Sequence, residues 1–396
     1  MDRNWLRRLA ILLPVIVTAM AVCGPLKAQS FETDLPRALL LDVQTGTVLF
    51  ETGADESFEP ASLTKIMTAE VLFHEISEGR VSPDQQFHVS EYAWRTGGAP
   101  SRSTAMFASV NSDIAVSDLM RGLVVPSGND AAIVLAEGIA GTETAFSLAM
   151  NRRAHDIGLK ASNFVNASGL EAADQRTTAR DLARLAVHVI ETYPDLYKVF
   201  AEPEFMWNKI RQRNRNPLLT LNIGADGFLT GYTEAAGFSL VGSAVLDGRR
   251  LIAVVSGAKT ARDRDQEARK LLDWGLRSFE VRRLFSAGEV IGEALVFGGD
   301  KQVVTLVAPA DIDVLALRNP DARLTARIVY DGPIAAPIAK GAAIGRLEVL
   351  SGSTRMFEAP LETGEAVEQG SLHRRAFDAV YEWATSAVRQ AFERLI

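Results

Sequence analysis

The chain is poor in the residue types that form covalent cross-links and many metal sites. Its single cysteine, Cys23, lies in an apolar N-terminal stretch, so a chain that has lost this stretch contains no thiol. This excludes disulfides, a cysteine nucleophile and cysteine-ligated metals in the mature protein. Basic residues are also outnumbered, with 42 Lys and Arg against 49 Asp and Glu and a net charge of −7. We therefore expect no general affinity for nucleic acid.

Residues 1–28 have the layout of a secretory signal. Three arginines precede an apolar run over about residues 9–22, and small residues follow. This order of basic, apolar and small residues predicts export, and we place the cleavage after Ala28. A retained membrane anchor is the alternative interpretation.

The remainder is long and apolar enough for two domains, since the chain has 396 residues and is 47% hydrophobic. Residues 29–282 begin and end with strand-like runs around a helical middle, which predicts an α+β domain with an antiparallel sheet covered by helices. Residues 283–368 alternate in short runs and predict a small all-β domain. Residues 370–396 predict an amphipathic helix that is too charged to span a bilayer. This helix lies either at a membrane interface or on the protein's own surface.

Local signals mark several element ends within residues 29–282. Gln44–Gly46 and Asp247-Gly248 predict hairpin turns, and the break at Pro126–Gly128 separates two helices. Thr178 is the expected N-cap of a further helix, with Asp181 three residues later. We expect the first hairpin to join three later strands, which begin near Asp226, in one sheet.

Ser62 and Lys65 are the first candidates for chemistry, in the segment PASLTKIMTA. They lie one helical turn apart in an otherwise apolar stretch, where a shielded lysine amine can take the proton of a serine hydroxyl. Taken alone, the pair is equally compatible with a capping serine and a surface lysine.

Two further polar elements follow at a distance. In VVPSGNDAA, Ser127 and Asn129 lie on a turn that opens a helix, where capping is the alternative explanation. In DGFLTGYT, Thr230 and Gly231 lie in a strand. A glycine within a strand indicates either a bulge or the close approach of another backbone, such as that of a substrate.

In this order, the three elements resemble the Ser-x-x-Lys, Ser-x-Asn and Lys-Thr-Gly motifs of penicillin-binding proteins. The chain looks like the D-alanyl-D-alanine carboxypeptidases, the low-molecular-mass penicillin-binding proteins. The segments NASGL (166–170) and DGFLTGYTEAAG (226–237) match this family as well. So do the β domain and the terminal helix, which in the family holds the enzyme on the outer face of the inner membrane.

The resemblance implies a role for each matching residue. Ser62 attacks the carbonyl between two terminal D-alanines, and Lys65 takes its proton, which requires a lysine pKa lowered by burial or by nearby positive charge. Ser127 relays the proton to the leaving amine, and Asn129 holds the substrate. The backbone N–H groups of Ser62 and Tyr232 form the expected oxyanion hole.

One position departs from the family pattern, because Leu229 replaces the lysine before Thr230 and Gly231. A lost charge contact to an anion costs about 1.5–3 kcal/mol. Without a cationic neighbour, the pKa of Lys65 is also expected to rise. Arg264 and Arg215 match family arginines of the cleft and are the candidates to compensate, with Arg264 contacting the substrate carboxylate beside Thr230.

We therefore predict a periplasmic serine carboxypeptidase that trims peptidoglycan pentapeptides through an acyl-enzyme and is inhibited by β-lactams. It needs no cofactor and no metal, and its last helix attaches it to the inner-membrane surface. Three alternatives remain open: an endopeptidase acting on cross-links, a β-lactamase, and a binding protein weakened in catalysis by Leu229. The β-lactamase is disfavoured because Gly128 stands where the Ser-Asp-Asn element of class A enzymes has its aspartate.

Overall fold

The computed structural model describes residues 31–318, 324–351 and 354–376. The predicted secretory signal over residues 1–28 lies outside this part of the chain. Of the predicted terminal helix over residues 370–396, only the first helical turn, residues 372–376, is described.

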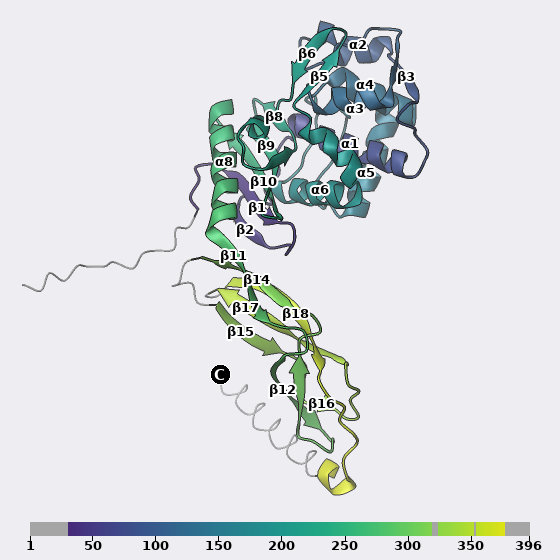
Figure 1. The fold of residues 1–396 in the computed structure, drawn as a ribbon. Helices are drawn as coiled ribbons and strands as arrows, with labels where there is room; N and C mark the ends of the chain where they lie inside the picture. Colours follow the sequence, from purple (N-terminus) through teal and green to yellow (C-terminus); the bar gives the residue numbers. More distant parts are fainter. Residues whose placement is uncertain (1–30, 319–323, 352–353, 377–396) are drawn as a thin grey trace, which may run out of the picture. The chain divides into compact units, whose positions relative to one another are not determined.

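The predicted antiparallel sheet is present in the first domain (Figure 1). Its strands follow the order β2-β1-β10-β9-β7, and β8 pairs with β9 beside β7. The first hairpin thus joins the later strands through β1 and β10, with Leu39 opposite Val254. The bounds of these strands are β1 Arg37–Asp42, β2 Val48–Thr52, β7 Ala225–Gly227, β8 Thr230–Thr233, β9 Gly237–Leu246 and β10 Arg249–Ala258.

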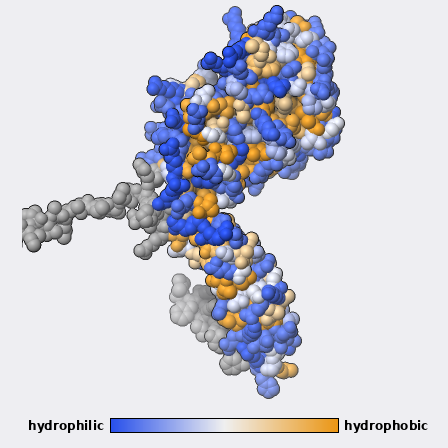
Figure 2. Space-filling view, in the orientation of Figure 1, coloured by the Kyte–Doolittle hydropathy of each residue, from blue (hydrophilic) through white to orange (hydrophobic). Residues whose placement is uncertain are grey.

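Alternation along the central strands places apolar side chains on both faces of this sheet. Leu39 packs into the large core shared with the helical region, whereas its neighbour Leu40 packs into the core under α8 (Ala261–Ser278). This follows from the two-residue period of a strand. Helices therefore cover both faces, and Figure 1 shows α8 on one side and the helical group on the other. The outer side of α8 forms a hydrophilic stripe in Figure 2.

The helical group holds the segments that build the site. As predicted, the helices on either side of Pro126–Gly128 are separate, and Thr178 caps its helix by accepting a hydrogen bond from the backbone N–H of Asp181 at 3.1 Å. The helix bounds are α1 Thr64–Ser77, α2 Glu91–Gly97, α3 Val116–Val124, α4 Asn129–Ala140, α5 Glu143–Ile157, α6 Ala179–Thr192 and α7 Pro194–Tyr197. Of the described helices, none alone is long and apolar enough to cross a membrane, although α4 and α5 together, bent by 84°, meet the criterion of length and composition.

Two short two-stranded sheets in the helical region had no clear signal in the sequence. One pairs β3 (Gln86–His88) with β4 (Asp113–Ala115), and the other pairs β5 (Glu204–Trp207) with β6 (Ile210–Arg213). Strands of three or four residues are too short to show a reliable alternation. The β5–β6 hairpin matters for the site because it immediately precedes Arg215.

The second domain is all-β, as predicted. It begins at β11, directly after α8 ends at Ser278, and its core is a separate cluster of apolar side chains that includes Val304, Leu306, Val349 and Leu361. The strands are β11 Phe279–Phe285, β12 Val290–Phe297, β13 Val303–Val307, β14 Ile312–Leu317, β15 Leu324–Val329, β16 Ile334–Ala335, β17 Ala343–Ser351 and β18 Thr354–Thr363. The α+β domain followed by a β domain confirms the predicted fold class.

Candidate active site

Ser62 lies in a single 3-10 turn, Ala61–Leu63, that leads directly into α1. Its side chain is half-buried and lines a cleft. Lys65 is the second residue of α1, so its side chain lies one turn further along on the same face. Its Nζ is 2.9 Å from Ser62 Oγ. The pair that the sequence left ambiguous is thus in direct contact, and Lys65 is not a surface lysine, because it is fully buried.

The environment of Lys65 favours a neutral amine. Burial lowers its pKa to about 7, the carboxylate of Asp130 acts in the opposite direction, and the charge of Arg215 lowers the pKa further. Nζ also donates to the carbonyl oxygen of Ser168 at 2.6 Å, which orients the amine. With Leu229 in place of the family lysine, burial still keeps the pKa of Lys65 low. Arg215, one of the two arginines expected to compensate, is a cationic neighbour that lowers it further.

Ser127 and Asn129 lie where the chain turns into α4. Ser127 has a φ of 59°, in the left-handed region, which aims the turn toward the cleft. Thr104 Oγ1 donates to the carbonyl of Ser127 at 2.7 Å, and Asn129 Nδ2 donates to Ser103 Oγ at 3.0 Å. Neither Ser127 Oγ nor Asn129 Oδ1 has a hydrogen-bond partner within the described residues, although both atoms are buried. Buried polar atoms of this kind are normally satisfied, so both are available to a ligand.

Asp130 is a buried residue of the site that the sequence analysis missed. Its carboxylate accepts hydrogen bonds from the backbone N–H groups of Met106 at 2.8 Å and Ala108 at 3.0 Å. These bonds hold the segment that carries Ser103 and Thr104 against the start of α4. Burial raises the pKa of Asp130, and the backbone donors act against this rise. In the sequence, an aspartate in the first turn of a helix is indistinguishable from an ordinary capping residue. Only the burial of Asp130 in the structure marks it as part of the site.

Strand β8 forms the wall of the cleft facing Ser62 and carries Thr230, Gly231 and Tyr232. The glycine is required by the protein itself, because a Cβ at Gly231 would lie 2.9 Å from the carbonyl oxygen of Pro60 and 2.8 Å from Ser239 Oγ. The strand therefore packs closely on the turn that presents the nucleophile. Leu229 is 1% exposed and belongs to the main core.

The other sides of the cleft are formed by the turn after Asn166 and by the start of α8. Gly169 adopts a φ of 81°, and a Cβ there would lie 1.8 Å from the carbonyl oxygen of Ala61. Opposite, the ring of Tyr232 lies 4.3 Å from that of Phe238, and the Arg264 guanidinium lies over Phe238 at 6.0 Å. Arg264 is also ion-paired with its neighbour Asp265 at 2.6 Å.

The structure brings all nine residues singled out in the sequence to one place. The cleft has a volume of about 880 Å³, enough for a short peptide. Lys65 does not line the cleft itself but is buried behind Ser62, in contact with its hydroxyl. In the described part of the chain, no group of three or more His, Cys, Asp or Glu side chains could hold a metal ion. The remaining eight residues line the cleft: Ser62, Ser127, Asn129, Arg215, Thr230, Gly231, Tyr232 and Arg264.

Comparison with known proteins gives the same assignment over both domains. The family model described as D-alanyl-D-alanine carboxypeptidase matches residues 26–260, and that of the penicillin-binding protein 5 C-terminal domain matches residues 279–369. The chain is 38% identical to D-alanyl-D-alanine carboxypeptidase DacC of Escherichia coli over 366 residues, covering 92% of this chain and 91% of the relative.

Solved structures agree. The structure of penicillin-binding protein 5 from Haemophilus influenzae superposes with a TM-score of 0.73 at 36% identity, covering 86% of this chain and 99% of that one. Penicillin-binding protein D2 from Listeria monocytogenes, solved in its ampicillin-bound form, gives a TM-score of 0.54 at 29% identity over 63% of this chain and 99% of its own. The chain therefore belongs to the D-alanyl-D-alanine carboxypeptidases, the serine peptidases of the low-molecular-mass penicillin-binding protein group.

Proposed function

We propose that this carboxypeptidase removes the last D-alanine from peptidoglycan stem peptides through an acyl-enzyme formed on Ser62. The observation that carries the mechanism is the 2.9 Å contact between Ser62 Oγ and the buried amine of Lys65. With a pKa of about 7, a substantial share of this amine is neutral at neutral pH and can accept a proton.

In the first half of the reaction, Lys65 takes the hydroxyl proton as Ser62 Oγ bonds to the carbonyl carbon of the penultimate D-alanine. The developing oxyanion is assigned to the backbone N–H groups of Ser62 and Tyr232, since both residues line the cleft where β8 packs closely on the nucleophile turn. The C–N bond then breaks, and the proton passes through Ser127 to the nitrogen of the leaving D-alanine. The unpartnered, buried Ser127 Oγ supports this role.

In the second half, water hydrolyses the ester between Ser62 and the shortened peptide, which restores the hydroxyl. Asn129 holds the backbone of the bound peptide through its free Oδ1. Thr230, Gly231 and Arg264 receive the terminal carboxylate, since β8 offers an extended edge and Arg264 supplies a cation at the same end of the cleft. A β-lactam occupies the same positions, and its acylation of Ser62 inhibits the enzyme.

The proposed location is the periplasm, at the outer face of the inner membrane. The secretory layout of residues 1–28 and the amphipathic pattern of residues 370–396 support export and peripheral attachment, respectively. Release of the full chain from membrane vesicles by salt or alkali, compared with a chain ending at residue 369, tests the attachment.

D-Alanine release from a pentapeptide ending in D-Ala-D-Ala tests the reaction. Wild type and the surface control Ser109→Ala are expected to release D-alanine, and Ser62→Ala is expected to release none. Turnover by Ser62→Ala would contradict the assigned nucleophile. If wild type cleaves only a cross-linked dimer and leaves the pentapeptide intact, the protein is an endopeptidase. Rapid multiple turnover of penicillin would instead identify a β-lactamase.

A further inference from the structure

Leu229 leaves the cleft without the cation that the Lys-Thr-Gly element provides in this family. Its side chain is 1% exposed and packs in the main core, so β8 contributes no charge beside Ser127. The Ser127 hydroxyl is correspondingly buried without a hydrogen-bond partner within the described residues. A proton relay through this hydroxyl needs positive charge nearby when the transition state forms.

Two cations line the cleft, and they differ in their availability. Arg264 is 8% exposed, pairs with Asp265 at 2.6 Å and lies over the Phe238 ring. Arg215 is exposed to the cleft and forms no ion pair with any residue that the structure describes. Its charge is therefore not already neutralised.

Arg215 is held in place at the element that carries Ser127. Its Nε donates to the carbonyl oxygen of Pro126 at 2.8 Å, and its backbone N–H donates to that of Val125 at 3.2 Å. These bonds fix the guanidinium next to the residue that precedes Ser127. Arg213, two residues earlier, is exposed at the end of β6 and does not line the cleft.

We propose that Arg215 supplies, beside Ser127 and Lys65, the positive charge that Leu229 withholds. It is thus a positioning residue whose charge keeps Lys65 neutral and stabilises negative charge as the proton passes through Ser127. This proposal about Arg215 refines the proposed function and rests on it. The direction in which Arg215 shifts the pKa of Lys65 agrees with this role.

Other charged groups also lie around this end of the cleft. Asp130, at the start of α4, acts against Arg215, while Arg264 and Glu171 lie on the cleft wall. Removing Arg215 leaves burial alone to oppose Asp130, so the pKa of Lys65 rises and less neutral amine remains at neutral pH. The acidic limb of the pH–rate profile must then move to higher pH.

The test is the pH dependence of acylation of the full chain by a fluorescent penicillin, together with D-alanine release from the pentapeptide. We expect Arg215→Gln to slow acylation at neutral pH by roughly tenfold and to move the acidic limb to higher pH. Arg215→Lys keeps the positive charge, so the acidic limb of its pH–rate profile is expected to stay near the wild-type position. The matched control Arg213→Gln makes the same charge change outside the cleft and is expected to leave the profile unchanged.

A rescue experiment makes the proposal specific. Adding Leu229→Lys to Arg215→Gln restores a cation from the β8 side of the cleft. The double variant is expected to recover the rate of acylation and to return the acidic limb of the pH–rate profile to its wild-type position. The idea is overturned if Arg215→Gln leaves the limb in place and raises only KM, or if Arg213→Gln causes the same shift. Absence of Ser62-dependent labelling in wild type would instead contradict the proposed function itself. Melting curves exclude misfolding of the double variant, and the Arg215 single variants decide the question without it.

Discussion

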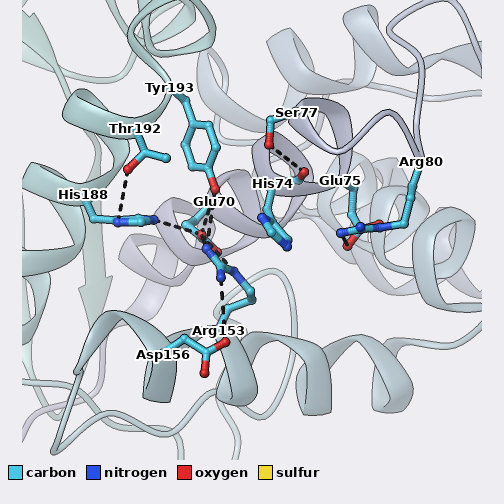
Figure 3. Close-up of polar contacts among 10 residues, drawn as sticks. All are labelled: Glu70, His74, Glu75, Ser77, Arg80, Arg153, Asp156, His188, Thr192 and Tyr193. Carbon is cyan, nitrogen blue, oxygen red and sulfur yellow. Dashed lines mark hydrogen bonds and ion pairs between the residues drawn. The ribbon is translucent and has the colours of Figure 1, made fainter.

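The helix that carries the nucleophile is anchored at its far side by a buried carboxylate. Glu70 of α1 is fully buried, and its Oε1 accepts hydrogen bonds from Arg153 of α5 at 2.5 Å and from His188 of α6 at 3.2 Å (Figure 3). Tyr193 OH is 3.4 Å from the same oxygen. The other oxygen, Oε2, is buried without a partner in the described residues. The replacement Glu70→Gln therefore tests how strongly this cluster holds three helices together.

The expected loss of unfolding free energy is about 3 kcal/mol, the lower end of the range for breaking a buried ion pair. The lower end applies because Arg153 and His188 keep 20% and 25% of their side chains exposed and can be partly rehydrated. Replacing Glu70 and Arg153 together is expected to cost less than the sum of the two single changes, because no uncompensated charge then remains.

The effect also has a predicted pH dependence. Burial alone raises the pKa of Glu70, but hydrogen bonds from His188 and Arg153 and their charges outweigh it and hold the pKa below its usual range. A carboxyl group with a lowered pKa in the folded state stabilises the fold above its unfolded pKa, and this contribution is lost as the pH falls through the folded value. The difference between wild type and Glu70→Gln should therefore be largest at neutral pH and shrink below about pH 4.

The assay is urea unfolding followed by tryptophan fluorescence, because Trp94, Trp207 and Trp274 all lie in the catalytic domain and their signal does not depend on acylation. Glu75→Gln is the matched control, because Glu75 lies on the same helix but pairs with the half-exposed Arg80 (Figure 3) and should cost below about 1 kcal/mol. The reasoning fails if the Glu70 and Glu75 variants unfold at the same urea concentration, or if the Glu70 effect does not change with pH.

Two further predictions concern the cleft itself. Because the pKa of Lys65 is about 7, acylation by a fluorescent penicillin should fall about tenfold for each pH unit below this value and level off above pH 8; a flat profile between pH 5.5 and 9 would exclude Lys65 as the base. Gly169→Ala should abolish acylation and lower the melting temperature strongly, because its Cβ would collide with the carbonyl oxygen of Ala61. Gly141→Ala is the control: it has a similar φ of 79° but open space around it, so it should cost only about 1 kcal/mol and leave acylation intact.

Several features of this fold could be predicted because their causes lie within a few residues of chain. Alternating apolar residues predicted the central strands, and the same alternation sends Leu39 and Leu40 to opposite faces. The cap at Thr178 needs only its own hydroxyl and the N–H three residues later. The spacing of Ser62 and Lys65 was readable for the same reason, since a helical turn brings them together wherever the helix lies. The strands of the β3–β4 and β5–β6 pairs were too short to leave such a pattern.

The sequence by itself determined the candidate residues for the chemistry and the type of elements that present them. Only the tertiary structure decided how these residues behave, because burial and electrostatics depend on segments far apart in the chain. Lys65 is a buried amine with a lowered pKa rather than a surface cation because the fold encloses it, while Ser168 accepts its hydrogen bond and the charges of Asp130 and Arg215 act on its pKa in opposite directions. The same holds for Glu70, whose partners lie more than eighty residues away. A pKa is set by desolvation and by charges in space, and neither can be read from neighbours along the chain.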